Sequence, residues 1–249
     1  MEKEEYRKHF ELEESFWWFA GRRQIILSVL RAFKILENPT KILDVGCGTG
    51  MNIQFFEQHG GEVFGCDLSR EALNFCQQRG IGCTAQGNGL QLPFKGESMD
   101  LATLLDVLYH KDIKSDITAL EETHRVLKKG GWLLITDSAF NFLRSSHDVA
   151  FHTRERYTRK VLKARLEEAG FEVCKLSYFN FFLFPLIVAV RLWEKKKVKS
   201  PDAVHSDLKP IHPALNTLLK GILLLEAKLI KRFRLPSGSS ILCLAKKPE

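Results

Sequence analysis

Short apolar runs alternate with amphipathic segments through most of the chain. Runs of this length, bounded by turn residues, are typical of strands rather than of buried helices. We expect seven strands, at residues 41–45, 62–66, 82–86, 100–105, 132–136, 171–178 and 240–245.

Amphipathic segments between these strands predict helices, at residues 52–59, 70–79, 114–128 and 158–169. The last of them has both end signals, because Thr158 suits the N-cap and Gly170 follows the C-terminus. Strands that alternate with helices are typical of a parallel sheet covered on both faces. The pattern therefore predicts an α/β fold.

Two segments lie outside this alternation. We interpret residues 1–37 as an N-terminal extension of two helices with a break near Gly21, and residues 38–249 as one domain. Inside this domain, residues 180–236 separate the last two strands and have apolar residues at helical spacing. We expect this segment to be a helical insert.

The charge is distributed unevenly. The 249 residues include 37 Lys and Arg against 30 Asp and Glu, a formal net charge of +7. Residues 191–249 contain 13 basic and 5 acidic residues, whereas residues 1–190 contain 24 and 25. A protein that binds nucleic acid along its surface would be basic throughout. We therefore expect a near-neutral body with a basic C-terminal section, and no nucleic-acid partner.

Composition and segment lengths exclude several classes of protein. With 45% hydrophobic and 27% charged residues, the chain is globular rather than disordered. The first residues lack the apolar segment of a secretory signal. The uncharged stretch 178–190 is shorter than the ~20 residues of a membrane-spanning helix. None of the six cysteines forms a CxxC pair, so we expect reduced cysteines and no metal site.

A glycine-rich loop follows the first strand. Gly46, Gly48 and Gly50 let the backbone approach a ligand closely, and the helix behind them offers free N–H groups. Asp67 ends the second strand, where a carboxylate can accept both hydroxyls of a ribose. This combination predicts a nucleoside-type cofactor. A dinucleotide fits less well, because Met51 stands where GxGxxG has glycine or alanine; a tight turn without a ligand is the structural alternative.

Further motifs follow in order. After ILDVGCGTG at 42–50 come GNGLQLPF at 87–94, MDLATLLDVLYH at 99–110 and RVLKKGGWLLI at 125–135. With these motifs the chain resembles the class I S-adenosylmethionine-dependent methyltransferases over residues 40–178 and the last strand. The resemblance implies a Rossmann-like sheet of seven mostly parallel strands with an antiparallel last strand, and S-adenosylmethionine as the cofactor.

The resemblance also implies which residues hold the cofactor. Asp67 resembles the family's ribose-binding acid, and the end of the 99–110 motif resembles the segment along the methionine end. Asn88 replaces an acid that meets the adenine amine, and its side-chain oxygen can still accept that hydrogen bond. The expected cofactor-binding residues are Arg22, Asp44, Gly46, Cys47, Gly48, Gly50, Asp67, Leu68, Asn88, Gly89, Leu105 and Asp106.

The N-terminal extension has a motif of its own. WWFAGRR at 17–23 resembles the opening of a bacterial subset of these enzymes. By this resemblance Arg22 pairs with the cofactor carboxylate, while Trp17 and Trp18 form a lid over the methyl group. Alternatively, the tryptophans pack the N-terminal helices onto the sheet. Tyr109 replaces the family's usual glutamate, and we expect it at the substrate side with the tryptophans.

Methyl transfer from a sulfonium is an in-line displacement, so the protein must align acceptor, methyl and sulfur and exclude water. A general base helps where the acceptor is a hydroxyl. The candidate catalytic residues are His110, His152 and Tyr157, each with a structural role as the alternative.

The predicted function is methyl transfer from S-adenosylmethionine to an O, N or C atom of a small or lipid-like acceptor. The alternatives are a nicotinamide-dependent oxidoreductase, a non-catalytic S-adenosylmethionine-binding protein, and a nucleic-acid or protein methyltransferase. The basic, apolar insert 180–236 predicts either a cap over a hydrophobic acceptor or peripheral contact with an anionic membrane. We expect the protein in the bacterial cytoplasm or at the inner face of the membrane.

Overall fold

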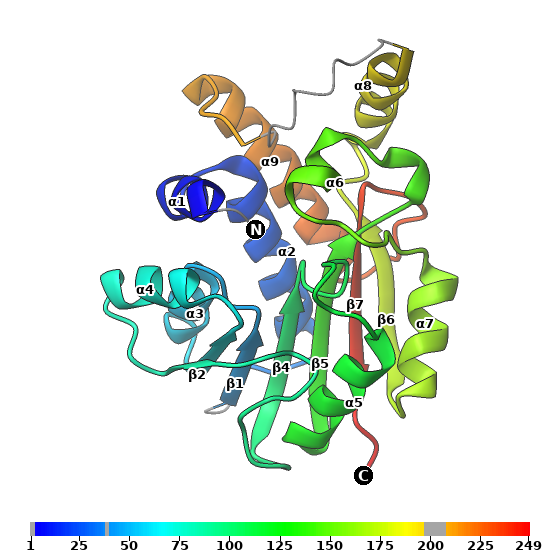
Figure 1. The fold of residues 1–249 in the computed structure, drawn as a ribbon. Coiled ribbons are helices and arrows are strands. Elements are labelled where there is room, and N and C mark those ends of the chain that lie inside the picture. The colour runs from blue at the N-terminus through cyan, green and yellow to red at the C-terminus, as the bar shows by residue number, and fades with distance from the viewer. Residues whose placement is uncertain (1–2, 38–39, 197–207) are drawn as a thin grey trace.

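A seven-stranded sheet forms the centre of the molecule (Figure 1). The computed structural model describes residues 3–37, 40–196 and 208–249. The strand order is β3-β2-β1-β4-β5-β7-β6, and β7 runs antiparallel to both of its neighbours while the other pairs are parallel. The mostly parallel sheet with an antiparallel last strand is therefore confirmed. The strands are β1 (Thr40–Val45), β2 (Gly61–Asp67), β3 (Thr84–Gln86), β4 (Met99–Leu105), β5 (Leu127–Ser138), β6 (Glu172–Phe179) and β7 (Ser240–Lys246).

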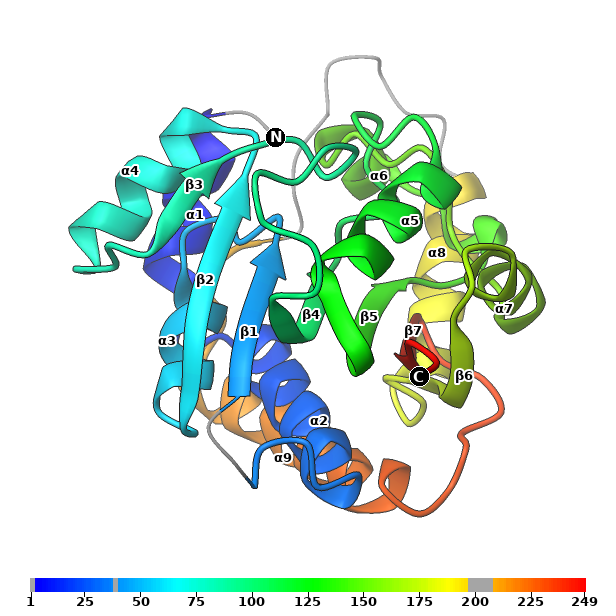
Figure 2. The same ribbon diagram turned by 90° about the horizontal axis from the view of Figure 1, so that it is seen from below.

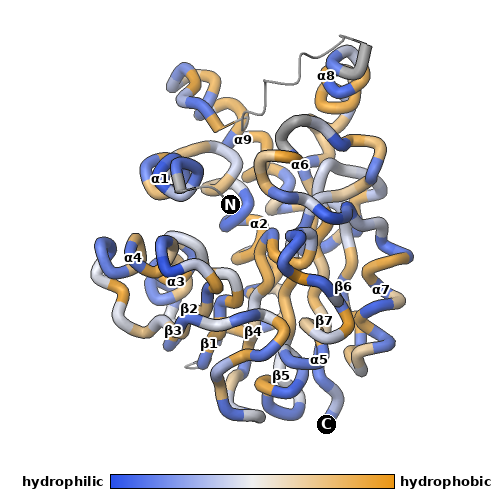
Figure 3. Tube along the Cα trace, viewed as in Figure 1, coloured by the Kyte–Doolittle hydropathy of each residue, from blue (hydrophilic) through white to orange (hydrophobic). Residues whose placement is uncertain are grey.

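Helices cover both faces of the sheet (Figure 2). α5 (Asp116–Val126) and α7 (Arg159–Glu168) contribute to the core on one face. α2 (Trp17–Ala32), α3 (Met51–Glu57) and α9 (Pro213–Ile230) contribute to the core on the other. Figure 3 shows hydrophobic residues concentrated along the strands and α2, whereas α7 alternates between hydrophobic and hydrophilic residues as a surface helix does.

The remaining helices lie around the carboxyl edge of the parallel strands. α1 (Lys3–Leu12) lies against α4 (Arg70–Gln78), and α8 (Phe184–Lys196) follows β6. Two short helices that no pattern predicted, η1 (Asn141–Leu143) and α6 (Ser146–Ala150), follow β5. The described part of the insert thus contains α8 and α9, as expected.

The prediction of a break between two helices near Gly21 is wrong. The break lies between Leu12 and Trp17, and Gly21 is inside α2. A Cβ atom at Gly21 would lie 2.4 Å from Cδ1 and 2.6 Å from Cβ of Leu223 on α9. The glycine therefore serves a close helix crossing, because a side chain there would overlap the partner helix.

The crossing is also held by hydrogen bonds at one end. Asn216 of α9 accepts the backbone N–H of Trp17 at 2.8 Å and donates to the carbonyl of Ser15 at 3.0 Å. The first N–H groups of a helix lack partners inside the helix. A side chain from α9 therefore supplies the cap that Phe16, at the N-cap position of α2, cannot provide.

Replacing Gly21 by alanine should destabilise the fold by about 1–3 kcal/mol, because the new methyl group overlaps Leu223. Urea unfolding followed by circular dichroism measures this change. Gly221→Ala is the matched control, since a Cβ at that α9 position meets no atom within 4 Å. It should be neutral or stabilise by roughly 0.4–1 kcal/mol. Equal destabilisation by both substitutions would contradict the crossing as the reason for Gly21.

Candidate active site

A cavity of about 830 Å³ opens at the carboxyl edge of the parallel strands. One wall is the glycine loop with the ends of β2 and β4. The second comes from α1 and the start of α2, and the third from the insert. Ligands of open α/β sheets bind at this edge. The cavity is therefore the candidate site, and its walls combine the parts that the sequence motifs singled out separately.

The glycine loop bends sharply under the cavity. Gly46 and Gly48 have φ angles of +70° and +55°, in the left-handed region that favours glycine. A Cβ at Gly46 would lie 2.6 Å from the Val107 side chain, so this turn requires glycine. A Cβ at Gly48 would meet no protein atom within 4 Å. Because Gly48 lines the cavity, its missing side chain leaves space for a ligand against the backbone.

Asp67 is held with its carboxylate at the cavity wall. One oxygen accepts the N–H of Gly48 at 2.9 Å, and the other accepts the N–H of Ser69 at 2.8 Å. Burial raises the pKa of this carboxyl, and the two backbone donors oppose that change. Each carboxylate oxygen has a further lone pair. This geometry fits the expected acceptor of two ribose hydroxyls.

Asn88 and Gly89 also line the cavity, beside the exposed Leu68. The Asn88 side-chain oxygen accepts the N–H of Leu90 at 3.0 Å. This bond orients the amide and uses one of the two acceptor positions of the oxygen. Its contact with an adenine amine stays a prediction that relies on the remaining lone pair.

An ion pair lies at the other end of the cofactor wall. Arg22 of α2 donates to the carboxylate of Asp106, which follows β4 with a φ of +61°. Both residues and Leu105 line the cavity. The Nε of Arg22 is buried and has no hydrogen-bond partner among the described residues. Arg22 therefore keeps a donor for a ligand carboxylate while Asp106 balances its charge.

Asp44 and Gly50 do not line the cavity and lie behind the loop. One Asp44 oxygen accepts the hydroxyl of Thr103, and the other has no partner among the described residues. Burial raises the pKa of Asp44 to about 7. Gly50, with a φ of +87°, is the N-cap of α3, where a Cβ would overlap Ile81. These two residues support the loop from below, whereas Cys47 lines the cavity as expected.

The expected substrate-side residues are all at the cavity. Trp17, Trp18 and Tyr109 all line the cavity. The Trp18 ring also stacks on Phe179 at the end of β6, with 5.6 Å between centroids and an angle of 10° between planes. The lid and packing interpretations of the tryptophans therefore do not exclude each other, because Trp18 packs on the sheet with one face and remains at the cavity.

The structure separates the three candidate catalytic residues. His110 lines the cavity. His152 does not, but its ring lies edge to face with that of His110 at 5.8 Å. Tyr157 is buried in the core, and its hydroxyl donates to Asp116 at 2.9 Å. Tyr157 is therefore not supported as a base, because a hydrogen-bonded network with Asp116 of α5 holds it away from the cavity.

Burial lowers the pKa of His110 to about 4, so the ring is neutral near pH 7. The backbone N–H of Asp112 donates to Nδ1 of His110 at 3.3 Å. A neutral ring with an accepting Nδ1 has its proton on Nε2. A carboxylate oxygen of Asp112 also lies 3.3 Å from Nδ1. With the backbone N–H as the partner of Nδ1, His110 presents a hydrogen-bond donor at Nε2.

Sequence motifs pointed to no function for α1, yet it closes one side of the cavity with Tyr6, His9 and the following Glu13. Glu13 accepts a hydrogen bond from Arg79, which follows α4, at 2.9 Å and one from the Thr49 hydroxyl. These bonds join α1 to the glycine loop. The only local signal is the spacing of Tyr6, His9 and Glu13 at three to four residues on one helix face.

Among the residues that the structure describes, no three His, Cys, Asp or Glu side chains gather as a metal site would require. The cysteines remain free, and Cys83 is exposed rather than buried.

Comparison with known proteins identifies the domain. A family model described as a methyltransferase domain matches residues 43–135. The chain contains a class I S-adenosylmethionine-dependent methyltransferase domain. An O-methyltransferase, resE, of Aspergillus sclerotiorum is 29% identical over 71% of this chain and 70% of its own length. The solved structure of a methyltransferase from Thermotoga maritima covers 98% of this chain and 95% of its own, with a TM-score of 0.59 at 19% identity.

Other relatives of this methyltransferase match over shorter lengths. The demethylmenaquinone methyltransferase of Streptomyces griseus is 37% identical over 39% of this chain and 42% of its own length. A tRNA methyltransferase of Arabidopsis thaliana matches over 24% of its length. The chain spans between 41% and 66% of four of the relatives that follow resE. The family match removes the nicotinamide-dependent oxidoreductase as an alternative.

The cavity of this methyltransferase fits its cofactor, S-adenosylmethionine. The open space at Gly48 lets the cofactor lie against the backbone of the loop. The carboxylate of Asp67 suits the ribose hydroxyls, and the buried Nε of Arg22 suits the cofactor carboxylate. When bound, S-adenosylmethionine supplies a methyl group on a positively charged sulfur that is already activated for displacement. The protein's part is then to position the acceptor and exclude water.

Replacing Asp67 by asparagine should weaken binding of S-adenosylhomocysteine by roughly tenfold or more, because a charged acceptor of ribose hydroxyls contributes ~1.5–3 kcal/mol. Isothermal titration calorimetry measures the affinity. Asp100→Asn is the control, since Asp100 bonds to Lys41 and Lys128 and does not line the cavity. Unchanged affinity in the Asp67 variant would contradict the assigned ribose contact.

Proposed function

We propose that this protein transfers the methyl group of S-adenosylmethionine to a hydroxyl oxygen of an aromatic acceptor that bears an alkyl chain. One observation carries the proposal: the cavity continues from the cofactor wall into an apolar section built by the insert. The apolar residues of this section are Leu183, Leu186, Ile187, Leu208, Ile211, Leu215 and Leu219. A chain of methylene groups is the ligand that such a lining stabilises.

Aromatic rings also line the cavity. They are Phe16, Trp17, Trp18, Phe19 and Tyr109. Aromatic rings bind one another in stacked and edge-to-face arrangements and hold a flat ligand in a defined orientation. The aromatic lining suits an acceptor whose aromatic ring is placed at the methyl group. The apolar section suits an alkyl chain of that acceptor that extends toward the insert.

The names of two relatives support an acceptor of this kind. One is an O-methyltransferase, and the other is a methyltransferase named for demethylmenaquinone. An aromatic hydroxyl loses its proton near pH 10, as tyrosine does. The acceptor can therefore release its proton to solvent water before it binds and react as the phenolate, which is a better nucleophile than an alkyl hydroxyl and needs no strong base beside it.

His110 is the residue that we infer orients the acceptor. Its Nε2 proton can hydrogen-bond to the acceptor oxygen and so place that oxygen in line with the methyl group and sulfur. The neutral ring also adds no positive charge beside a sulfonium. We therefore treat His110 as a positioning residue and not as a general base.

Two alternatives keep specific support. The names of the tRNA methyltransferase relatives favour a nucleic-acid acceptor. The apolar, aromatic lining of the cavity could stack on a nucleobase, but it does not suit the charged phosphates of a nucleic acid. A non-catalytic S-adenosylmethionine-binding protein would need only the cofactor wall. We propose further that the protein is located in the bacterial cytoplasm, with peripheral contact of residues 180–236 at the inner membrane face. An acceptor with an alkyl chain would be found at that face.

His110→Ala should lower kcat by roughly tenfold, because the acceptor oxygen loses one hydrogen bond. His110→Gln should recover most of that loss, since its amide still donates. A general base would not be rescued by glutamine, so equal loss in both variants would contradict the positioning role. Steady-state kinetics with a phenolic acceptor measures kcat, and S-adenosylhomocysteine affinity serves as the control for folding.

Activity of the unchanged protein should not fall through protonation of His110 between pH 7 and pH 5. Burial depresses the pKa from its ordinary 6.5 to about 4, so the ring stays neutral over this range and gains its proton only near pH 4. The pH profile of kcat measures the effect. Comparison with the His110→Gln profile isolates the histidine, and a His-dependent loss centred near pH 6.5 would contradict a depressed pKa.

Ile187→Trp should raise KM for phenols with long alkyl chains by roughly tenfold and leave short-chain phenols unaffected, because the indole fills the apolar section. Val188→Trp is the matched control, since Val188 is next to Ile187 on α8 and does not line the cavity. Methyl transfer from labelled S-adenosylmethionine to a series of phenols of increasing chain length measures both. No turnover with any hydroxyl acceptor, together with tight cofactor binding, would favour the non-catalytic alternative.

A further inference from the structure

α9 is apolar on two opposite faces. Its inner face packs Leu223, Ala227 and Ile230 into the core beside α2. Its outer face presents a second row of apolar residues at helical spacing, which we call the α9 ridge: Leu215, Leu218, Ile222, Leu225 and Leu229. A helix that is apolar all round is normally buried on every side. The ridge therefore needs an explanation other than the packing of this chain.

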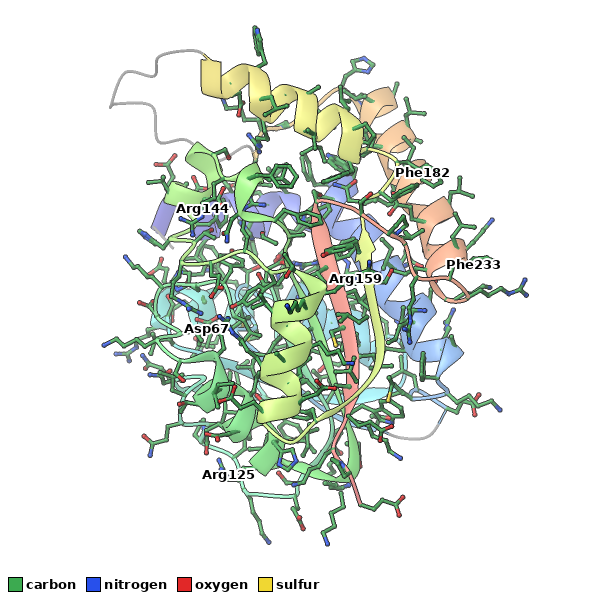
Figure 4. All side chains as sticks on the ribbon, turned by 90° about the vertical axis from the view of Figure 1, so that its right-hand side faces the viewer. Asp67, Arg125, Arg144, Arg159, Phe182 and Phe233 are labelled. Atoms are coloured by element: carbon green, nitrogen blue, oxygen red, sulfur yellow. The ribbon has the colours of Figure 1, made fainter. Side chains whose placement is uncertain are left out.

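The ridge is open to solvent. Leu215, Leu218 and Leu225 are 46%, 61% and 50% exposed. Two exposed phenylalanines lie on the same side of the molecule, Phe182 beside α9 and Phe233 just beyond its C-terminal end (Figure 4). Contiguous exposed apolar surface of this kind marks a site of interaction.

The exposed Asp, Glu, Lys and Arg residues of the described stretch 208–236 are all basic. Lys228, Lys231, Arg232 and Arg234 are exposed near the C-terminal end of α9. The one acidic residue between 208 and 236, Glu226, is buried and accepts the backbone N–H of Phe182 at 3.0 Å. No exposed carboxylate of this described stretch offsets the basic residues. The surface thus combines leucines with uncompensated positive charge, as helices at anionic membrane surfaces do.

The ridge reaches the mouth of the acceptor cavity. Leu215 belongs to the ridge and also lines the cavity. Leu186 of α8 lines the cavity too and is 62% exposed. An apolar molecule can therefore pass from a surface covering the ridge into the cavity without crossing water.

A second copy of the chain is the competing occupant. A symmetric dimer would place the ridge of one copy against that of the other. The basic residues of the stretch 208–236 from both copies would then approach one another, which opposes association. The same basic residues attract an anionic surface. This attraction favours a lipid bilayer over a second copy of the chain as the occupant of the ridge.

We infer that the α9 ridge docks on an anionic lipid bilayer, so that the mouth of the acceptor cavity opens toward the hydrocarbon. Docking itself depends only on the exposed surface, whereas the entry of an alkyl-bearing acceptor from the bilayer rests on the proposed function. Among the described residues no helix is long and apolar enough to cross a membrane. The ridge is placed to lie in the interface, with its lysines extending to the headgroups.

The test is co-sedimentation of the full chain with vesicles. We expect binding to phosphatidylcholine vesicles that contain phosphatidylglycerol, weaker binding to phosphatidylcholine alone, and release by salt. The double substitution Leu218→Glu and Leu225→Glu should reduce the affinity for vesicles by more than roughly tenfold. Burial of a single leucine side chain in the bilayer already raises the affinity by about that factor. Neither residue lines the cavity. Val149→Glu, at a 59% exposed position of α6, is the matched control and should bind normally.

Three results would overturn the inference. They are no binding to anionic vesicles, equal binding of the ridge variant and the Val149 control, and a dimer in sedimentation equilibrium that the ridge variant dissociates. S-adenosylhomocysteine affinity and turnover of a short-chain phenol in solution should be the same in all variants, which verifies folding. Vesicle binding is measured without an acceptor, so a failure of docking and a failure of the proposed methyl transfer give different results.

Discussion

The close crossing of α2 and α9 is the constraint on which the cavity depends. Gly21 allows the two helices to approach, and Asn216 ties the start of α2 to α9. From this crossing, α2 directs Arg22 to the cofactor wall and Trp18 to the aromatic lining, while α9 directs Leu219 to the apolar section. One helix interface between opposite ends of the chain therefore sets the distance between the methyl donor and the acceptor.

The charges of the site suit a sulfonium cofactor. A buried guanidinium next to a positively charged sulfur would be strongly unfavourable by itself. Asp106 pairs with Arg22 and neutralises it, and the depressed pKa of His110 keeps that ring uncharged. Arg22 can thus serve a ligand carboxylate without placing net positive charge at the reacting centre. Apolar residues of the insert also line the cavity, and an apolar lining favours the exclusion of water that a displacement requires.

Local patterns were sufficient for the strands and the glycine loop, because strand alternation and glycine turns express their structure within a few residues. The antiparallel last strand and the placing of Arg22 and Asp106 were expected from the family resemblance instead. Local patterns were insufficient where distant segments meet. Gly21 looked like a helix break because its partner, Leu223, is far away in the sequence. Tyr157 looked catalytic because its spacing gives no sign of Asp116 on α5. The wall formed by α1 is likewise a tertiary contact without a motif.

The outer leucines of α9 differ in kind from the inner ones. Leu223 and Ile230 are buried and hold the helix against the core, so stability alone accounts for them. Leu218 and Leu225 contact solvent and add little to that stability, while exposed apolar surface promotes aggregation. Polar residues at both positions would leave the fold intact. Since Leu215 joins this row to the cavity mouth, the most direct reason for the row is the passage of an apolar acceptor.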